Sequence, residues 1–539
     1  MKKLMLLGDE ALAQGVVDAG CSGVFAYPGT PSTEVMEYIQ KCPEALQRDI
    51  HRTWSSNEKT AVEEAVGMSY TGKRTMSCMK HVGLNVAADP FMNSAFVGAN
   101  GGHIVTVADD PSMHSSQNEQ DSRFYAKFAM IPCMEPSNQQ ECYDMAFHAY
   151  ELSEKYKLPV MMRLETRLSH SRSGVQRREM LAENELKLPE DRNQFMLLPA
   201  FARRKYKHLI EIQPDLTEES EKSPFNWVEE GKDSSLGIIA CGLAYNYVKE
   251  ATTHYNCEYP ILKISQYPIP VKMIEKFIDG CAKILVVEEG QPLVEEMLKG
   301  AIPKNTKITG RLDGTFARDG EMDPNKVAVA LGKETLSGEG LPEVVTGRPP
   351  ALCVGCPHID SYKALNEALK SYVEDGQRHV FSDIGCYTLG FLPPYNAINT
   401  CLDMGASITM AKGAANAGLF PAIAVIGDST FCHSGMTGLL DCLYDKTNLV
   451  IIILDNSTTG MTGGQDYTGF GKLESICMGL GVEKEHIRVV TPLSRQFEDN
   501  VAVLKEEIEY EGVSVIIPRR ECVQTMTRRM RAQKKQEAK

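Results

Sequence analysis

Residues 422–458 read AIAVIGDSTFCHSGMTGLLDCLYDKTNLVIIILDNST, in which two apolar runs each end in short polar residues. Apolar runs of this length are typical of strands buried in a parallel sheet, and the segment between them is long enough for a crossover helix. Parallel strands of open α/β sheets bind ligands at their carboxyl ends. The sequence therefore predicts a polar cluster at one edge of a sheet: Gly427, Asp428, Ser429, Asn456 and Thr458.

The predicted cluster supplies oxygen ligands for a hard cation. The Asp428 carboxylate, the Asn456 side-chain amide and the Thr458 carbonyl can hold Mg²⁺, which keeps open positions for a diphosphate. We call these three residues the diphosphate clamp. Their spacing resembles the thiamine diphosphate motif, a Gly-Asp-Gly followed one βαβ crossover later by Asn, with Ser429 in place of the second glycine. An ordinary βαβ unit with polar loop ends would give the same local pattern.

The composition excludes several classes of protein. A chain of 539 residues with 43% hydrophobic and 24% charged residues is expected to form several globular domains, and it has no run of the roughly 20 apolar residues that a membrane helix needs. A net charge of −14 argues against nucleic acid as a partner, because phosphate contacts need a basic face. The 16 cysteines are scattered, as expected for reduced thiols, so we expect a cytoplasmic protein.

Strand-like and helix-like segments alternate along most of the chain, which predicts doubly wound parallel sheets. A Gly- and Pro-rich stretch at 337–350 fits a linker. The predicted fold is α/β and multidomain, with two doubly wound parallel-sheet domains and a smaller α/β domain between them. The expected segments are a first domain at 1–180, a connection at 181–234, the smaller domain at 235–335, the last domain at 350–525 and a basic tail at 526–539.

Thiamine diphosphate also needs a carboxylate at its aminopyrimidine ring, in an apolar pocket where the acid can share a proton with the ring. Glu58 fits this requirement, because it begins a predicted helix on which Ala61, Val62 and Ala65 form an apolar face. An acidic residue in a first helical turn also stabilises the helix dipole, and that role is common. We expect Glu58 to be the catalytic carboxylate because the chain also contains the separate clamp.

A series of motifs extends this interpretation along the whole chain. These motifs and their order along the chain resemble the large subunit of indolepyruvate ferredoxin oxidoreductase, a family of the 2-oxoacid:ferredoxin oxidoreductases. The motifs that carry the resemblance, besides the clamp, are YPGTP at 27–31, NEK at 57–59, MKHVGLNVAADP at 79–90, ADDPSMHSSQNEQD at 108–121, CVGCPH at 353–358 and SDIGCY at 382–387.

The resemblance implies oxidative decarboxylation of an arylpyruvate such as indolepyruvate on thiamine diphosphate and Mg²⁺, with the acyl group passed to coenzyme A and electrons to ferredoxin. It makes 1–180 a pyrimidine-binding domain, 235–335 a transketolase C-terminal-like domain and 350–525 a diphosphate-binding domain. It also implies a homodimer core with a smaller second subunit. By the family's motifs, catalytic roles fall to Thr30, Glu58, His81 and His358, and cofactor contacts to Gly385, Cys386, Met404, Gly405 and Ala406.

Some of these residues have plain structural alternatives. His81, expected on a loop after a strand, could face the cofactor or the substrate, or it could satisfy loop carbonyls. The turn around Thr30 could meet the 2-oxoacid, or it could be a helix N-cap made by Ser32 or Thr33. Met404, expected to support the bent shape of the cofactor, could be ordinary core.

In the last domain, we expect backbone N–H groups at Gly405 and Ala406 to approach phosphate oxygens. His358 is expected to contact the diphosphate or to transfer a proton. Packing is favoured over metal binding for Cys353 and Cys356, because a lone Cys-x-x-Cys is weak evidence for a metal.

Members of this family typically continue into a ferredoxin-like domain with two Cys-x-x-Cys-x-x-Cys-x-x-x-Cys-Pro runs, and this sequence has no such run. We therefore expect no iron–sulfur cluster on this chain, with clusters on a partner. One alternative is a non-oxidative 2-oxoacid decarboxylase or acyl-carbanion transferase. Another is a non-catalytic homologue, which predicts a damaged site, whereas Glu58, Asp428 and Asn456 are all present.

Overall fold

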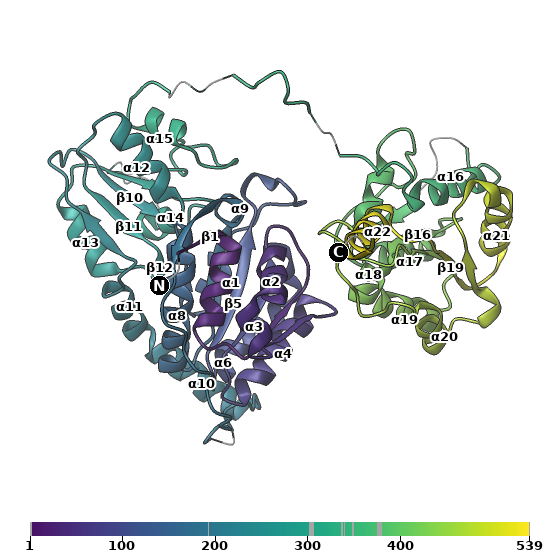
Figure 1. The fold of residues 1–539 in the computed structure, drawn as a ribbon, viewed down its shortest axis with the longest axis horizontal. Coiled ribbons are helices and arrows are strands. Elements are labelled where there is room, and N and C mark those ends of the chain that lie inside the picture. The colour runs from purple at the N-terminus through teal and green to yellow at the C-terminus, as the bar shows by residue number, and fades with distance from the viewer. Residues whose placement is uncertain are drawn as a thin grey trace. The chain divides into compact units, whose positions relative to one another are not determined.

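The computed structural model describes residues 3–191, 193–300, 307–335, 338, 340–347, 350–374 and 380–537. They form two compact units that divide between Gly340 and Leu341. The first unit runs from purple to teal and the second from green to yellow in Figure 1. Each unit is described by itself.

The first unit is built on a seven-stranded sheet in the order β12-β6-β7-β5-β4-β2-β3. All neighbouring strands are parallel except β12, which is antiparallel to β6. The chain passes from β2 to β3 on one side and then returns to β4 on the other, so the strand order reverses at β2 and β4. The strands are β2 (Gly23–Ala26), β3 (His51–Trp54), β4 (Thr75–Lys80), β5 (His103–Asp109), β6 (Cys133–Met134), β7 (Val160–Glu165) and β12 (Gln266–Tyr267).

Helices cover both faces of this sheet because alternate strand residues point to opposite sides. On β5, Ile104 and Ala108 join one core, whereas Val105 and Val107 join the other. The first core packs α1 (Gly8–Asp18), α2 (Thr33–Lys41) and α8 (Gln139–Tyr156); the second packs α4 (Glu58–Tyr70), α6 (Ala88–Val97) and α10 (Pro199–Glu211). The other elements of this region are β1 (Lys3–Leu7) paired with β8 (Arg172–Gln176), α3 (Pro43–Gln47), α5 (His81–Val86), α7 (Arg123–Ala129), α9 (Thr166–His170) and α11 (Gln213–Glu221).

The first unit also contains a five-stranded sheet in the order β14-β13-β10-β11-β9. It is parallel except for β9, which is antiparallel to β11. The region expected as a connection at 181–234 contributes β9, α10 and α11. The elements are β9 (Trp227–Glu229), β10 (Gly237–Cys241), β11 (Ile261–Ile264), β13 (Ile284–Val287), β14 (Ile308–Thr309), α12 (Ala244–His254), α13 (Val271–Asp279), α14 (Leu293–Lys299) and α15 (Pro324–Ala330).

Buried ion pairs join the two sheets of the first unit. The Arg163 guanidinium is fully buried, and it donates to Asp109 at 2.6 Å and to Glu165 at 2.6 Å. Arg123, equally enclosed, lies 3.0 Å from Glu288, which directly follows β13 of the five-stranded sheet. Because a buried charge without its partner is costly, these contacts fix the five-stranded sheet against the carboxyl edge of the seven-stranded one.

The second unit is a five-stranded sheet in the order β15-β16-β17-β19-β18, and all its strand pairs are parallel. Helices α16 and α21 share one core with the sheet, and α17, α19 and α20 share the other. The elements are β15 (Val380–Ser382), β16 (Ile423–Gly427), β17 (Leu449–Leu454), β18 (Ile487–Val490), β19 (Val513–Pro518), α16 (Pro357–Leu369), α17 (Ala406–Asn416), α18 (Asp428–Thr430), α19 (Met436–Tyr444), α20 (Leu473–Leu480), α21 (Phe497–Glu509) and α22 (Val523–Glu537).

The fold class predicted from the sequence is confirmed: two doubly wound parallel-sheet regions with a smaller α/β region between them in the chain. Among the helices that the structure describes, none is both long enough and apolar enough to cross a membrane.

Candidate functional site

Glu58 is the first residue of α4, directly after the Asn57 N-cap, whose side chain accepts a hydrogen bond from the Thr60 amide at 2.9 Å. Glu58 itself is 5% exposed. The carboxylate lies against the backbone of Gly83 in α5, so closely that a Cβ on Gly83 would stand 2.5 Å from Glu58 Oε1. Because α4 follows β3 and α5 follows β4, the carboxylate lies at the carboxyl edge of the sheet, beside the strands where the order reverses.

His81 is the first residue of α5 rather than part of a loop, because the helix starts as soon as β4 ends. It is 1% exposed, and its Nε2 lies 3.1 Å from the carbonyl oxygen of Asn118. A carbonyl only accepts, so Nε2 carries the proton and Nδ1 of the neutral ring is an acceptor. Within the described part of the chain, this buried Nδ1 has no hydrogen-bond partner. His81 therefore satisfies a loop carbonyl with one nitrogen and keeps the other for a donor.

The turn after β2 brings Thr30 to the same edge. Thr30 is half-buried, and its carbonyl accepts a hydrogen bond from Ser115 Oγ at 3.3 Å. Ser32 occupies the N-cap position of α2, but its hydroxyl donates to the Gly29 carbonyl at 2.7 Å and makes no capping bond. The Thr33 hydroxyl accepts from the Gly29 amide at 3.0 Å. These hydroxyls hold the turn itself, so side-chain capping of α2 does not account for it.

Asp110 organises the polar loop that follows β5. Its carboxylate accepts hydrogen bonds from Ser116 Oγ at 2.7 Å, Thr166 Oγ1 at 2.7 Å and the Ser115 amide at 2.8 Å. Burial alone would raise the pKa of Asp110, but these hydrogen bonds and the Lys80 ammonium lower it below its usual value. The loop is therefore held around an ionised carboxylate.

In the second unit, the strand register explains why Asp455 lies beside the clamp residue Asp428. Gly427 on β16 lies opposite Leu454 on β17, so the next residues, Asp428 and Asp455, emerge side by side. Asp428 accepts from the amide of Ser457 at 2.8 Å and is 2% exposed. Burial, and then the neighbouring Asp455, raise the pKa of Asp428 well above its usual value. Asp455 is already paired with Arg519, whose Nε lies 2.5 Å from its carboxylate. Asp428 is therefore the carboxyl that a divalent cation would stabilise here, and with the Asn456 amide beside it this edge fits Mg²⁺.

Asn456 contacts two polar side chains and one backbone amide at this edge. Its Nδ2 donates to His358 Nε2 at 3.3 Å and lies 3.7 Å from Cys386 Sγ, while its Oδ1 accepts from the Thr458 amide at 3.2 Å. Burial, with Arg520 nearby, lowers the pKa of His358 to about 4. His358 is therefore neutral at physiological pH and acts here as an acceptor, which disfavours an electrostatic contact with a diphosphate.

The amides at the start of α17 differ from the sequence-based expectation. The Gly405 amide donates to Asp383 Oδ2 at 3.1 Å, and the Ala406 amide donates to the Asp403 carbonyl at 3.2 Å. Both groups expected to approach a phosphate are thus used within the chain. Gly405 is needed for another reason: its φ of 98° is left-handed, and a Cβ there would lie 2.6 Å from Ser434. Met404, just before it, is half-buried.

Sequence reasoning missed Asp383 and Tyr387. The Tyr387 ring lies against Gly385 and Gly427, where a Cβ would stand 2.2 Å and 2.5 Å from it, so both glycines leave room for this ring. The Tyr387 hydroxyl bonds to Asp383, and burial raises the pKa of Asp383 to about 6. Asp383 follows β15 as Asp428 follows β16, so the same strand-end signal could have identified it. Ser429, the remaining predicted cluster residue, is buried beside Asp428.

Four thiols lie in one neighbourhood of the second unit. Burial raises the pKa of Cys386, and Cys356, Asp428, Cys522 and Cys353 raise it further. The thiol of Cys356 has its pKa raised to about 11, mainly by burial. Nevertheless, among the described residues no group of three or more His, Cys, Asp or Glu side chains is arranged to hold a metal ion.

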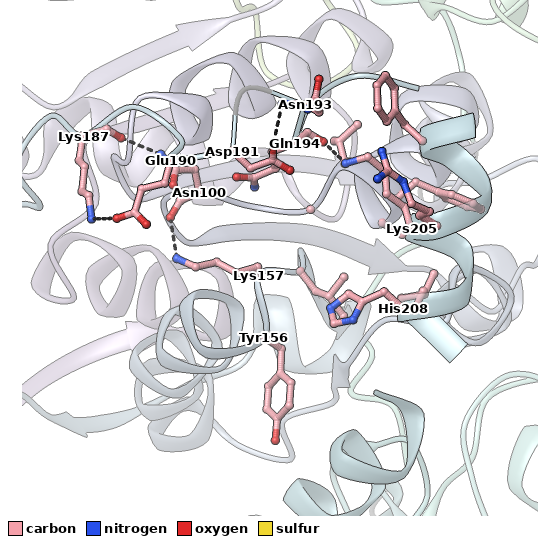
Figure 2. Close-up of a pocket in the computed structure, with 18 residues that line it drawn as sticks. Asn100, Tyr156, Lys157, Lys187, Glu190, Asp191, Asn193, Gln194, Lys205 and His208 are labelled. Atoms are coloured by element: carbon pink, nitrogen blue, oxygen red, sulfur yellow. Dashed lines mark hydrogen bonds and ion pairs between the residues drawn. The ribbon is translucent and has the colours of Figure 1, made fainter. Parts of the chain in front are cut away.

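The cavity drawn in Figure 2, about 830 Å³ in volume, is a different feature. Asn100 and Lys157 on its wall precede β5 and β7, so it lies at the amino edge of the sheet, opposite Glu58. Its polar groups bond to one another: Lys187 to Glu190 at 2.8 Å, and Lys157 to the Asn100 carbonyl at 3.3 Å (Figure 2). The candidate site is therefore at the carboxyl edge.

Two family models match the chain. The model described as "Pyruvate flavodoxin/ferredoxin oxidoreductase, thiamine diP-bdg" matches residues 14–201, which include Glu58 and His81. The model described as "Thiamine pyrophosphate enzyme, C-terminal TPP binding domain" matches residues 383–517, which include Asp428 and Asn456. Thiamine diphosphate, the cofactor expected from the sequence, agrees with both.

Whole-chain relatives agree with the domain matches. Indolepyruvate oxidoreductase subunit IorA of Archaeoglobus fulgidus is 41% identical, covering 99% of this chain and 89% of its own length. The protein of the same name from Pyrococcus horikoshii is 39% identical, covering 99% and 88%. The structure of 2-oxoglutarate:ferredoxin oxidoreductase from Magnetococcus marinus shares the fold, with a TM-score of 0.51 and 17% identity over 61% of this chain and 65% of that one. The chain therefore belongs to the indolepyruvate oxidoreductase IorA family of thiamine-diphosphate-dependent 2-oxoacid:ferredoxin oxidoreductases.

Proposed function

We propose that this chain carries out the oxidative decarboxylation of an arylpyruvate such as indolepyruvate, forming an acyl-coenzyme A and passing electrons to ferredoxin. The observation that carries the proposal is the buried Glu58 carboxylate at the reversal point of a sheet within the matched thiamine-binding region. When bound, thiamine diphosphate supplies the nucleophilic carbon that attacks the keto group and the electron sink that allows CO₂ to leave.

The first unit supplies the proton chemistry in this proposal. Glu58 would hydrogen-bond the aminopyrimidine nitrogen of the bound cofactor, and the apolar residues Ala61 and Val62 on the same helix would keep water from the carboxyl. His81 offers Nδ1 as an acceptor for a donor on the substrate or cofactor. Thr30 presents its hydroxyl to the 2-oxoacid from the neighbouring turn.

The second unit supplies the metal and diphosphate contacts. Asp428, Asn456 and the Thr458 carbonyl would hold Mg²⁺, with Asp455, itself paired with Arg519, beside Asp428. Gly385, Cys386 and Gly427 line the same strand ends. His358, neutral and hydrogen-bonded to Asn456, orients that amide, and its lowered pKa disfavours the proton transfer expected from the sequence.

The test replaces Glu58 with Gln, which keeps the shape and removes the acid. With the partner subunit, thiamine diphosphate, Mg²⁺, coenzyme A and a viologen acceptor, Glu58→Gln should lose CO₂ release from indolepyruvate and slow hydrogen exchange at the cofactor's reactive carbon. Glu63→Gln is the control, because Glu63 lies on the same helix, is 46% exposed and pairs only with exposed Lys59 in the ion pairs described. Exchange at the wild-type rate in Glu58→Gln would remove Glu58 from this role.

Electrons are proposed to leave through iron–sulfur clusters on a partner subunit, and the core is proposed to be a cytoplasmic homodimer. The four neighbouring thiols make metal analysis of the isolated chain the decisive assay. Little iron or acid-labile sulfide on this chain supports partner-held clusters. About four irons per chain, lost on Cys386→Ser, would instead place a cluster at these thiols.

Product analysis separates the non-oxidative alternatives. Acyl-coenzyme A with viologen reduction supports the oxidative reaction, whereas free aldehyde without reduction supports a simple decarboxylase. A non-catalytic homologue would bind the cofactor and release no CO₂ from any 2-oxoacid.

A further inference from the structure

Lys80 occupies the point of the first sheet at which the strand order reverses. It is the last residue of β4, and its register partner on neighbouring β5 is Ala108, just before the acidic pair Asp109 and Asp110. On the other side of β4, strand β2 ends at Ala26 and leads into the turn that contains Thr30. Ligands of open α/β sheets bind in the crevice at such a reversal.

The side chain of Lys80 is held between the segments that follow β2 and β5. Its methylene groups lie against Gly29, where a Cβ would stand 3.0 Å from Lys80 Cγ. Its ammonium donates to the Ser115 carbonyl at 3.2 Å. The ammonium is thus positioned by contacts on both neighbouring segments rather than extending freely into water.

The Lys80 ammonium has donors to spare. An ammonium has three N–H groups, and one is directed at Ser115. Within the described chain, Lys80 forms no ion pair, although Lys59, Lys73 and many other lysines do. Burial lowers the pKa of Lys80, while Asp110 and Glu58 act to raise it. This ammonium therefore lies near two acids, is partly stripped of water and is paired with neither.

A purely structural role does not account for Lys80. Asp110, the nearest candidate partner, already accepts hydrogen bonds from Ser116, Thr166 and the Ser115 amide. The loop therefore has hydrogen bonds of its own besides the one from Lys80 to the Ser115 carbonyl, and the other two N–H groups of the ammonium are not used in it.

The chemistry of the site calls for a cation at this place. A 2-oxoacid is an anion, and the ionised Asp110 carboxylate would repel it. The segments 27–33, 80–83 and 109–118, which lie at the ends of β2, β4 and β5, contain Lys80 as their only lysine or arginine. Of the two histidines there, His114 lies 2.9 Å from Glu321, and His81 bonds to the carbonyl of Asn118 at 3.1 Å.

We propose that the Lys80 ammonium binds the carboxylate of the 2-oxoacid substrate and makes the site selective for acids over neutral ketones. The inference rests on the proposed function and adds to it the group that recognises the substrate charge. The substrate carboxylate accepts hydrogen bonds from the two N–H groups of Lys80 that are not directed at Ser115, close to Glu58. Because this carboxylate becomes CO₂, the contact is lost as the reaction proceeds.

The test compares an acid with its neutral ester, using a ligand that cannot react. Indole-3-lactate lacks the keto group, so its binding and that of its methyl ester can be measured by calorimetry on the assembled protein with thiamine diphosphate and Mg²⁺. The wild type should bind the acid about 10- to 100-fold more tightly than the ester, as expected for a charge-assisted contact. Lys80→Gln should bring this ratio to about 1 by weakening the acid alone.

Two further variants keep the test independent of folding. Lys80→Arg retains the charge and should keep most of the preference, and Lys59→Gln, which removes an exposed lysine one residue after Glu58, should leave it unchanged. In turnover with indolepyruvate, Lys80→Gln should raise KM more than it lowers kcat.

The outcomes distinguish this inference from the proposed function. If Lys80→Gln keeps the acid preference, or weakens acid and ester equally, Lys80 does not bind the carboxylate. If the wild type releases CO₂ from indolepyruvate without preferring the acid, the inference fails and the proposed function stands. If the wild type neither releases CO₂ from indolepyruvate nor prefers the acid, the inference and the proposed function both fail.

Discussion

Replacing Gly83 with Ala should disable the site while leaving the fold intact. The new Cβ would stand 2.5 Å from Glu58 Oε1, 2.6 Å from Cγ and 2.8 Å from Cδ. Carbon and oxygen atoms in contact need about 3.5 Å, so the Glu58 carboxylate must move by about 1 Å. A displacement of this size in a catalytic group can lower the rate about 100-fold.

The stability of the Gly83→Ala variant should change little. The crowded atoms belong to a flexible side chain, and the overpacking cost of about 1–3 kcal/mol is offset by the roughly 1 kcal/mol that Ala gains over Gly in a helix. Gly67→Ala is the matched control, because Gly67 lies in α4 and a Cβ added there would meet no other atom within 4 Å. It should unfold at the wild-type temperature or slightly above and keep full activity.

The assay is CO₂ release from indolepyruvate by the complex with its partner, together with thermal unfolding of each variant. We expect Gly83→Ala to lose about two orders of magnitude in kcat with an unfolding free energy within roughly 1–2 kcal/mol of the wild type. Wild-type activity in Gly83→Ala would refute the argument, because it would mean that the Glu58 position does not control the reaction. A large loss of stability would show that α5, rather than Glu58, had moved.

Three further predictions concern buried charges. Asp428→Asn should abolish Mg²⁺-dependent cofactor binding, and unchanged cofactor affinity in titrations would contradict this. The same substitution should stabilise the cofactor-free protein at neutral pH, because the raised pKa of Asp428 favours folding only at pH values where the carboxyl is protonated. Burial raises the pKa of Asp9 to about 8, so the free energy of unfolding should fall as pH rises from about 4 to 8. In chemical denaturation, Asp9→Asn should remove this pH dependence and raise the free energy of unfolding at pH 7 by at most roughly 4 kcal/mol. If the pH dependence persists in the variant, another group causes it. Arg163→Leu should lower the unfolding free energy by about 3–5 kcal/mol, because it leaves Asp109 and Glu165 buried without their guanidinium, and an unchanged melting temperature would rule out a structural role for this network.

The sequence predicted those parts of the site that depend on strand ends. Asp428 and Asn456 each follow an apolar run, and parallel pairing in register places such residues together whatever else the chain does. Glu58 was predictable in the same way, since Asn57 and the apolar positions after it define a helix start. In each case a local pattern determines the position of the residue.

The residues that were missed depend on contacts between segments far apart in the chain. Nothing near Cys386 in sequence indicates that Cys356 and Cys522 lie close enough to raise its pKa. The amides at Gly405 and Ala406 looked free because Asp383, which accepts from the first of them, is 22 residues earlier in the sequence. Sequence patterns show which backbone groups a helix end leaves open, but tertiary contacts decide which of them are used.

The charge at the two strand edges explains why they fit different parts of one reaction. At the edge of the second unit, burial and the neighbouring Asp455, itself paired with Arg519, raise the pKa of Asp428, and a divalent cation would favour its ionised form. At the edge of the first unit, the Glu58 carboxyl lies close enough to the Lys80 ammonium to act on its pKa. That combination suits a substrate that arrives as an anion and reacts beside a proton donor. In the proposed reaction, the first edge would select the substrate by its charge, while the second would anchor the cofactor through a metal.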